Sequence, residues 1–105
     1  MKESLLQKKV KQAIQERYAT GVWYYHPMDR TQRGIIDVIL SFYGIFVAAE
    51  IKTDLIKNPP TKLQEYNLNK IAATGGFALK ADSVEELINM LDYIKTNYIL
   101  TNRNR

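Results

Sequence analysis

The sequence predicts a single α/β domain in which helices flank a small mixed sheet. Helical patterns lie near both ends, and two long apolar runs meet at Tyr43-Gly44 in the middle. The chain has 105 residues, enough for one hydrophobic core and too few for two. Its hydrophobic content of 46% and charged content of 25% are typical of folded proteins rather than disordered ones. We expect one domain over residues 1–96 and a basic tail over 97–105.

The first part of the chain predicts a helix and a strand. Between Glu3 and Tyr18, apolar residues recur at spacings of three and four, which is typical of an amphipathic helix. Gly21 ends this pattern. The aromatic and β-branched segment from Val22 to His26 predicts a strand, which Pro27 stops before a polar loop.

Two longer strands follow, at Ile35–Phe42 and Ile45–Ile51. Only Tyr43 and Gly44 separate them, which predicts a β-hairpin. Both segments are almost continuously apolar, so we expect both faces of this part of the sheet to be covered.

The second half predicts a helix at Thr61–Ala73, a short strand at Phe77–Lys80 and a last helix at Ser83–Thr96. Ser83 with Glu86 three residues later is a capping box, which marks the start of the last helix. The resulting order of elements is α-β-β-β-α-β-α.

Composition narrows the possible functions. The chain has no cysteine, which excludes disulfides, thiolate metal sites and cysteine nucleophiles and is in keeping with a cytoplasmic location. No signal-peptide pattern is present, and no apolar run approaches the ~20 residues of a membrane span. The net charge of +4 favours an anionic partner, although a solvated basic surface explains it equally well.

Three charged residues interrupt the apolar hairpin: Asp37, Glu50 and Lys52. Glu50 and Lys52 are two residues apart and therefore share a face of their strand. If the turn contains an even number of residues, counting back from it places Asp37 directly opposite Glu50. Their β-carbons would then lie roughly 4.5 to 5.5 Å apart, a spacing at which like charges destabilise a sheet.

Two carboxylates held together in apolar surroundings must share a proton or bind a cation. Mg²⁺ or Mn²⁺ fits best, because these ions take oxygen ligands and the backbone carbonyl of Ile51 offers a further one. Lys52 would orient the water nucleophile or offset charge in the transition state, which favours phosphodiester hydrolysis. The alternative is an exposed patch in which Lys52 is only a salt-bridge partner.

These residues resemble the PD-(D/E)XK nuclease motif: "GIID", a gap of twelve residues and "EIK". More specifically, "RGIIDVIL", "AAEIKTD" and the segment "PTKLQEYNLNKIAATGGFALKADSVEEL" resemble a stand-alone VRR-NUC domain of the phage and bacterial type, over roughly residues 3–91. One departure is Ile36, since the family usually has proline before the aspartate. The resemblance implies a restriction-endonuclease-like α-β-β-β-α-β core.

The resemblance also implies an activity, that of a deoxyribonuclease dependent on Mg²⁺ or Mn²⁺. Asp37 and Glu50 would bind the metal, Lys52 would be the catalytic lysine, and Glu3 would reach the metal through water. Gln64 matches a catalytic-site glutamine of the family. Glu3 also suits a helix amino terminus, and Gln64 also completes a capping box with Thr61, so these alternatives stay open.

Stand-alone members of the family are similar to Holliday-junction resolvases and act as dimers. The resemblance therefore implies branched DNA as the substrate, a homodimer, and a bacterial or phage-infected cell as the setting. Two alternatives remain: a non-catalytic DNA-binding or assembly subunit with the same fold, and a small partner-binding module.

Several further residues have two possible roles. Three basic loop residues would contact DNA phosphates or be solvated: Arg30, Arg33 and Lys57. Three neighbouring aromatic residues would pack in the core, the commoner role, or stack on unpaired bases: Trp23, Tyr24 and Tyr25. The lone His26 is expected to lie outside the site.

Overall fold

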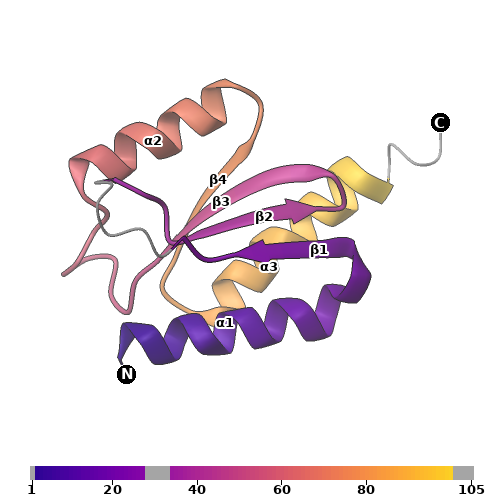
Figure 1. Cartoon of the computed structure of the whole chain (residues 1–105), viewed down its shortest axis with the longest axis horizontal. Coiled ribbons are helices and arrows are strands. Elements are labelled where there is room, and N and C mark those ends of the chain that lie inside the picture. The colour runs from indigo at the N-terminus through magenta and orange to yellow at the C-terminus, as the bar shows by residue number, and fades with distance from the viewer. Residues whose placement is uncertain (1, 28–33, 101–105) are drawn as a thin grey trace.

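The computed structural model describes residues 2–27 and 34–100, and it confirms the predicted α/β fold (Figure 1). In the described residues, three α-helices and four strands follow one another in the predicted order: α1 (Glu3–Tyr18), β1 (Val22–Tyr25), β2 (Val38–Phe42), β3 (Ile45–Ile51), α2 (Lys62–Ala73), β4 (Phe77–Ala81) and α3 (Val84–Ile94). The sheet has the order β1-β2-β3-β4. It is mixed, because β3 and β4 are parallel whereas the other neighbours are antiparallel.

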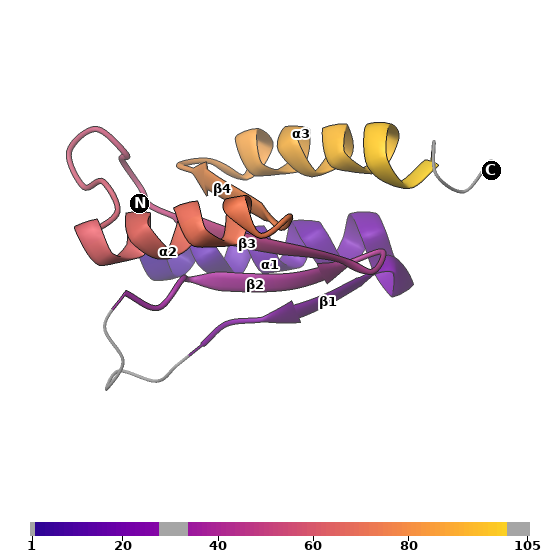
Figure 2. The same ribbon diagram turned by 90° about the horizontal axis from the view of Figure 1, so that it is seen from above.

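The helices lie on both faces of the sheet. Figure 2 shows α2 in front of the strands and α1 behind them, with α3 beside the β4 edge. The main core lies between the sheet and the pair α1 and α3, and it contains Leu6, Val10 and Ile14 of α1 and Leu87 and Leu91 of α3. α1 therefore packs along the strands that carry the predicted site.

Helix α2 covers only part of the opposite face. A small cluster joins Ile36, Ala48 and Leu68, with Ile71 and Ala78 packed against it. Three aromatic side chains of this face stay about half exposed: Trp23 (60%), Tyr25 (48%) and Phe46 (47%). The expectation that both faces of the hairpin are covered is thus wrong at Phe46, near the turn, because α2 covers only part of this face.

The hairpin has the predicted register. Tyr43 (φ 50°) and Gly44 (φ 86°) form a two-residue turn whose positive φ angles suit the twist of the strands. The turn pairs Phe42 with Ile45, and the ladder ends with Val38 opposite Ala49.

The second strand starts at Val38 rather than at the predicted Ile35. Ile36 is buried in the cluster beneath α2, whereas Val38 is buried in the main core. Strand alternation would put both side chains on one face, so the backbone must leave the regular ladder between them. The segment before Val38 is therefore held by α2 rather than by strand pairing.

The last helix is longer than predicted. After Ile94 the chain continues as a π-helix, Lys95–Leu100, and the side chain of Ile99 is buried in the main core. The predicted end at Thr96 and the tail from residue 97 are therefore wrong for residues 97–100, while 101–105 lie outside the described residues.

Helices α1 and α3 are joined by a polar cluster as well as by the core. Arg17 donates two hydrogen bonds to the carboxylate of Asp92, at 2.9 and 2.7 Å, and the Tyr18 hydroxyl donates a third at 2.7 Å. Arg17 holds the pKa of Asp92 below its ordinary value.

Within the described ranges, no helix is long and apolar enough to cross a membrane.

Candidate active site

The open end of the β2–β3 hairpin brings Asp37 and Glu50 together. The backbone N–H of Asp37 donates to Glu50 Oε1 at 2.9 Å, and the N–H of Ile51 donates to Asp37 Oδ2 at 2.9 Å. Each carboxylate thus accepts a hydrogen bond from the backbone of the opposite strand. The predicted juxtaposition of the two acids is confirmed.

Glu50 is fully buried, with 0% of its surface exposed. Its Oε2 atom has no hydrogen-bond partner among the residues that the structure describes. Burial and, after it, the negative charge of Asp37 raise the pKa of Glu50 to about 7, while the hydrogen bond from the Asp37 N–H opposes the shift. A buried carboxylate with a free oxygen calls for a cation beside it.

Lys52 supplies one positive charge. Its Nζ atom lies 3.5 Å from Glu50 Oε2 and 3.8 Å from Glu3 Oε1, and only 11% of its side chain is exposed. Its backbone N–H donates to the carbonyl of Ala81 at 3.0 Å, which holds this end of β3 against β4. The exposed-patch alternative is therefore wrong, because Glu50 is buried and Lys52 nearly so.

Glu3 lies at the start of α1, where its carboxylate faces Lys52. The helix thus brings a third acidic residue to the rim of the site across the sheet. A carboxylate also suits the first turn of a helix, so the two roles considered for Glu3 are compatible.

Gln64 supports the backbone that leads to Asp37. Its Oε1 accepts from the Thr61 N–H and its N–H donates to Thr61 Oγ1, which completes the capping box of α2. Its Nε2 also donates to the carbonyl of Ile35 at 3.3 Å, and Asn67 donates to the carbonyl of Gly34 at 2.7 Å. α2 thereby fixes the segment that has left the strand ladder.

Gly34 makes this arrangement possible, and replacing it tests the arrangement. Its φ is +74°, and an added Cβ would collide with the side chain of Leu63. We expect Gly34→Ala to lower the free energy of unfolding by about 2–4 kcal/mol, from the positive φ and the overpacking together. Urea denaturation measures this loss.

Gly44→Ala is the matched control, because φ there is +86° but no atom lies within 4 Å of an added Cβ. The control should cost only about 1–2 kcal/mol. Adding Leu63→Ala to Gly34→Ala should recover part of the difference. Equal losses at the two glycines would contradict the contact with α2.

His26, expected to lie outside the site, is in contact with it. Its Nδ1 lies 2.6 Å from the carbonyl oxygen of Asp37. Because a carbonyl can only accept, Nδ1 donates this hydrogen bond. The sequence held no local signal for this contact, because it follows from the pairing of β1 with β2, which places Tyr25 opposite Ile39 and so brings position 26 close to Asp37.

The other predicted contact residues are spread more widely. Lys57 is exposed in the loop after β3, where its N–H donates to Asp54 Oδ1 at 3.1 Å. Arg30 and Arg33 lie outside the described residues. Asp37, Glu50 and Lys52 thus converge, whereas the contact seen for Lys57 is with Asp54.

The site fits a hard divalent cation. In the described part of the chain, no group of three or more His, Cys, Asp or Glu side chains is arranged to hold a metal. Two carboxylates are present, however, and Mg²⁺ is commonly held by one or two carboxylates with water and substrate phosphate. The Ile51 carbonyl adds an oxygen, because in a strand it points to the same side as the Ile51 N–H, which bonds Asp37. The unpartnered Glu50 Oε2 agrees with such a ligand set.

Comparison with known proteins identifies the fold. No protein-family model and no curated protein matches the sequence. A solved structure described as "VRR_NUC domain" is similar, with a TM-score of 0.67 and 18% sequence identity over 91% of this chain and 96% of that chain. A likeness at this sequence identity is evidence about the fold alone. It confirms the predicted restriction-endonuclease-like fold, which this chain shares with the VRR_NUC domain.

Proposed function

We propose that this chain is a metal-dependent DNA endonuclease. Asp37, Glu50 and Lys52 would form the active site at which it hydrolyses phosphodiester bonds. The observation that carries the proposal is the buried Glu50, whose Oε2 has no hydrogen-bond partner in the described structure and lies 3.5 Å from Lys52 Nζ. Such a group is costly to bury and is typical of functional sites.

Asp37, Glu50 and the carbonyl of Ile51 would hold Mg²⁺ or Mn²⁺. Glu3 Oε1 lies 3.8 Å from Lys52 Nζ, so the charges of the two side chains influence each other. Glu3 would contact the metal from the rim of the site, through a water molecule. When bound, the cation would polarise the scissile phosphate and offset its charge. Asp37 keeps its place because the Ile51 N–H and the backbone contacts of Gln64 and His26 fix the segment around it.

Lys52 is suited to stabilise charge that develops during hydrolysis. Its ammonium is held between Glu50 and Glu3 and is largely removed from solvent, where electrostatic interactions are stronger than in water. The same group would orient a water molecule toward phosphorus. Gln64 would act as a positioning residue, through the carbonyl of Ile35.

DNA is the proposed substrate class, and branched DNA the finer proposal. The likeness to a VRR_NUC domain and the net charge of +4 support DNA. Branched substrates and a homodimer rest on the resemblance of the sequence to stand-alone VRR-NUC domains, and a dimer would present two sites to a symmetric junction. The intact set of two acids and a lysine favours catalysis over the alternative of a non-catalytic assembly subunit.

A panel of DNA substrates tests the proposal. The protein is incubated with four-way junction, flap, duplex and single-stranded DNA in Mg²⁺, Mn²⁺ or EDTA. We expect cleavage with either ion, none in EDTA, and the fastest cleavage on the junction. Junction binding without cleavage in any metal would instead support the assembly subunit, and no binding at low salt would support the partner-binding module. Size-exclusion chromatography with light scattering tests the dimer.

A further inference from the structure

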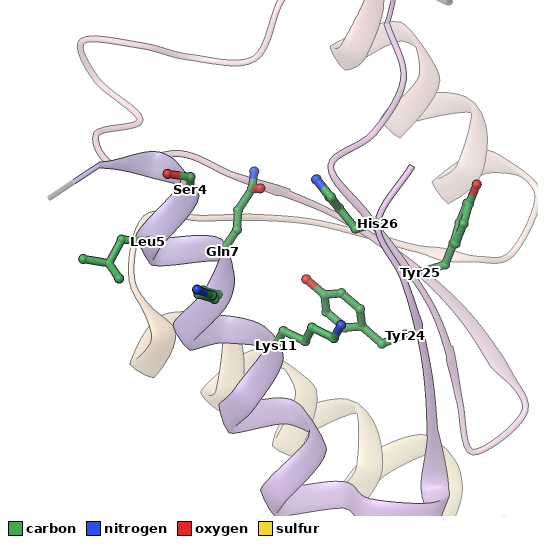
Figure 3. Close-up of a pocket in the computed structure, with 8 residues that line it drawn as sticks. Ser4, Leu5, Gln7, Lys11, Tyr24, Tyr25 and His26 are labelled. Carbon is green, nitrogen blue, oxygen red and sulfur yellow. The ribbon is translucent and has the colours of Figure 1, made fainter. Parts of the chain in front are cut away.

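A groove runs between the first turns of α1 and the end of β1 (Figure 3). Its volume is about 670 Å³, and it lies beside the proposed catalytic site. Both elements contribute lining residues: Ser4, Lys8 and Lys11 from α1, and Tyr24, Tyr25 and His26 from β1 and its end. The proposed reaction uses none of these side chains directly.

The groove has the charge of a nucleic-acid site. Lys8 and Lys11 are one helical turn apart and both line it, whereas no lining residue is acidic. The Lys11 ammonium lies 5.7 Å from the centre of the Tyr24 ring, which holds it over the wall formed by β1. Two lysines on one wall of a groove would bind successive phosphates of a strand.

The groove opens onto the catalytic site. Ser4 follows Glu3 directly, and His26 is hydrogen-bonded to the carbonyl of Asp37. Burial raises the pKa of the Tyr24 phenol to about 12, and the charge of Asp37 lies near enough to contribute to the shift. A strand that lies in the groove would therefore continue into the site without a break.

The size of the groove favours one strand over two. A volume of about 670 Å³ is typical of a small-ligand pocket and accepts one or two nucleotides. A duplex is two strands wide and would not enter a groove of this volume between a helix and the edge of a sheet. The groove therefore favours a single unpaired strand.

The far side of β1 offers a surface for bases. Tyr25 stacks on Trp23 with ring centres 5.6 Å apart and an angle of 16° between the planes. Both rings are about half exposed, and Figure 3 shows Tyr25 pointing away from Tyr24 across the strand. Because β1 is an edge strand, a base can pass over its free edge onto this pair.

The geometry points to a specific role: the α1–β1 groove binds an unpaired DNA strand next to the scissile phosphate. Lys8 and Lys11 contact its phosphates, and the Trp23–Tyr25 pair stacks on its bases. The role rests on the proposed nuclease function for its position in the reaction, but binding itself requires neither metal nor cleavage. It also accounts for a preference for branched DNA, which supplies an unpaired strand beside a duplex.

Binding of oligothymidylate in EDTA at low salt tests this role. The chain has a single tryptophan, so quenching of its fluorescence reports on β1 alone. We expect the oligonucleotide to quench Trp23 and to bind at least about tenfold more tightly than a duplex of equal length. Lys8→Ala and Lys11→Ala should each weaken binding and lower the slope of log K against log salt by about 0.7.

Lys9→Ala is the matched control, because Lys9 is exposed on the same helix but does not line the groove. Lys9→Ala should leave the slope of log K against log salt unchanged. Equal losses for Lys9→Ala and Lys11→Ala, or equal binding of duplex and single strand, would overturn the inference. Two outcomes separate the two proposals. Strand binding by the unaltered protein without cleavage in any metal refutes the nuclease alone, and junction cleavage with unaltered strand binding in the Lys8→Ala, Lys11→Ala double variant refutes the groove alone.

Discussion

Asp37→Asn is expected to reduce DNA cleavage by about 10³-fold or more while leaving the fold intact. Asparagine keeps the shape of the side chain and an oxygen that can accept from the Ile51 N–H at this position. It removes the negative charge that would hold the cation against Glu50. Initial rates on a four-way junction in saturating Mn²⁺ measure the loss, and circular dichroism checks the fold.

Two comparisons make this result specific to the site. Asp54→Asn changes the same charge in the loop after β3, where asparagine can still accept the turn hydrogen bonds of Ile56 and Lys57, so cleavage should hardly change. Lys52→Ala should lower the rate by about 10²–10³-fold, as for other groups that stabilise transition-state charge. Cleavage that survives Asp37→Asn would remove Asp37 from the reaction.

Glu50→Gln is expected to make the metal-free protein more stable at about pH 8. The pKa of Glu50 is raised from 4.5 to about 7 in the folded chain, so folding favours the protonated acid. Stability from this group is fully present below its unfolded pKa and is lost as the pH rises through about 7. Ionised Glu50 then costs roughly 3 kcal/mol, a cost that glutamine avoids.

Urea denaturation in EDTA between about pH 4.5 and 8 measures this difference. The two proteins should match at the acid end and diverge as the pH rises. Glu85→Gln, an exposed change in the first turn of α3, should show no such divergence. If Glu50→Gln proves less stable than the parent at pH 8, Glu50 is not a strained carboxylate, and the proposed cation site loses its physical support.

Metal should reverse the order of stability. Under the proposal Mn²⁺ would bind the ionised form of Glu50, so it should raise the melting temperature of the parent protein and not that of Glu50→Gln. The proposed function of Glu50 would therefore work against stability, as is common for charged groups buried at active sites.

The central hairpin could be predicted from sequence because its register depends on one local feature. A two-residue turn at Tyr43-Gly44 fixes every pair up to Val38 and Ala49, and the acids lie one pair further along. The position of Lys52 beside Glu50 follows from the two-residue period of a strand. Local turn chemistry was thus enough to assemble most of the candidate site.

Features that depend on tertiary packing could not be predicted. The break in the ladder at Ile36 arises from packing beneath α2, and the contact of His26 with Asp37 arises from pairing of β1 with β2. The length of the last helix depends on a place in the core for Ile99. An apolar strand likewise predicts burial, but it does not show how much of the sheet a helix covers. The sequence therefore could not decide between core packing and exposure for Trp23 and Tyr25.

The crossed hydrogen bonds of Asp37 and Glu50 would also tie the proposed catalysis to the dynamics of the hairpin. Both bonds lie at the end away from the turn, where a β-hairpin frays first. Opening of this end also requires the hydrogen bonds of His26 and Gln64 to the segment around Asp37 to break, and it would expose the buried Glu50. For the proposed nuclease, the fraction of molecules able to bind metal would depend on this local opening equilibrium, and cleavage would be lost on warming before the whole chain unfolds.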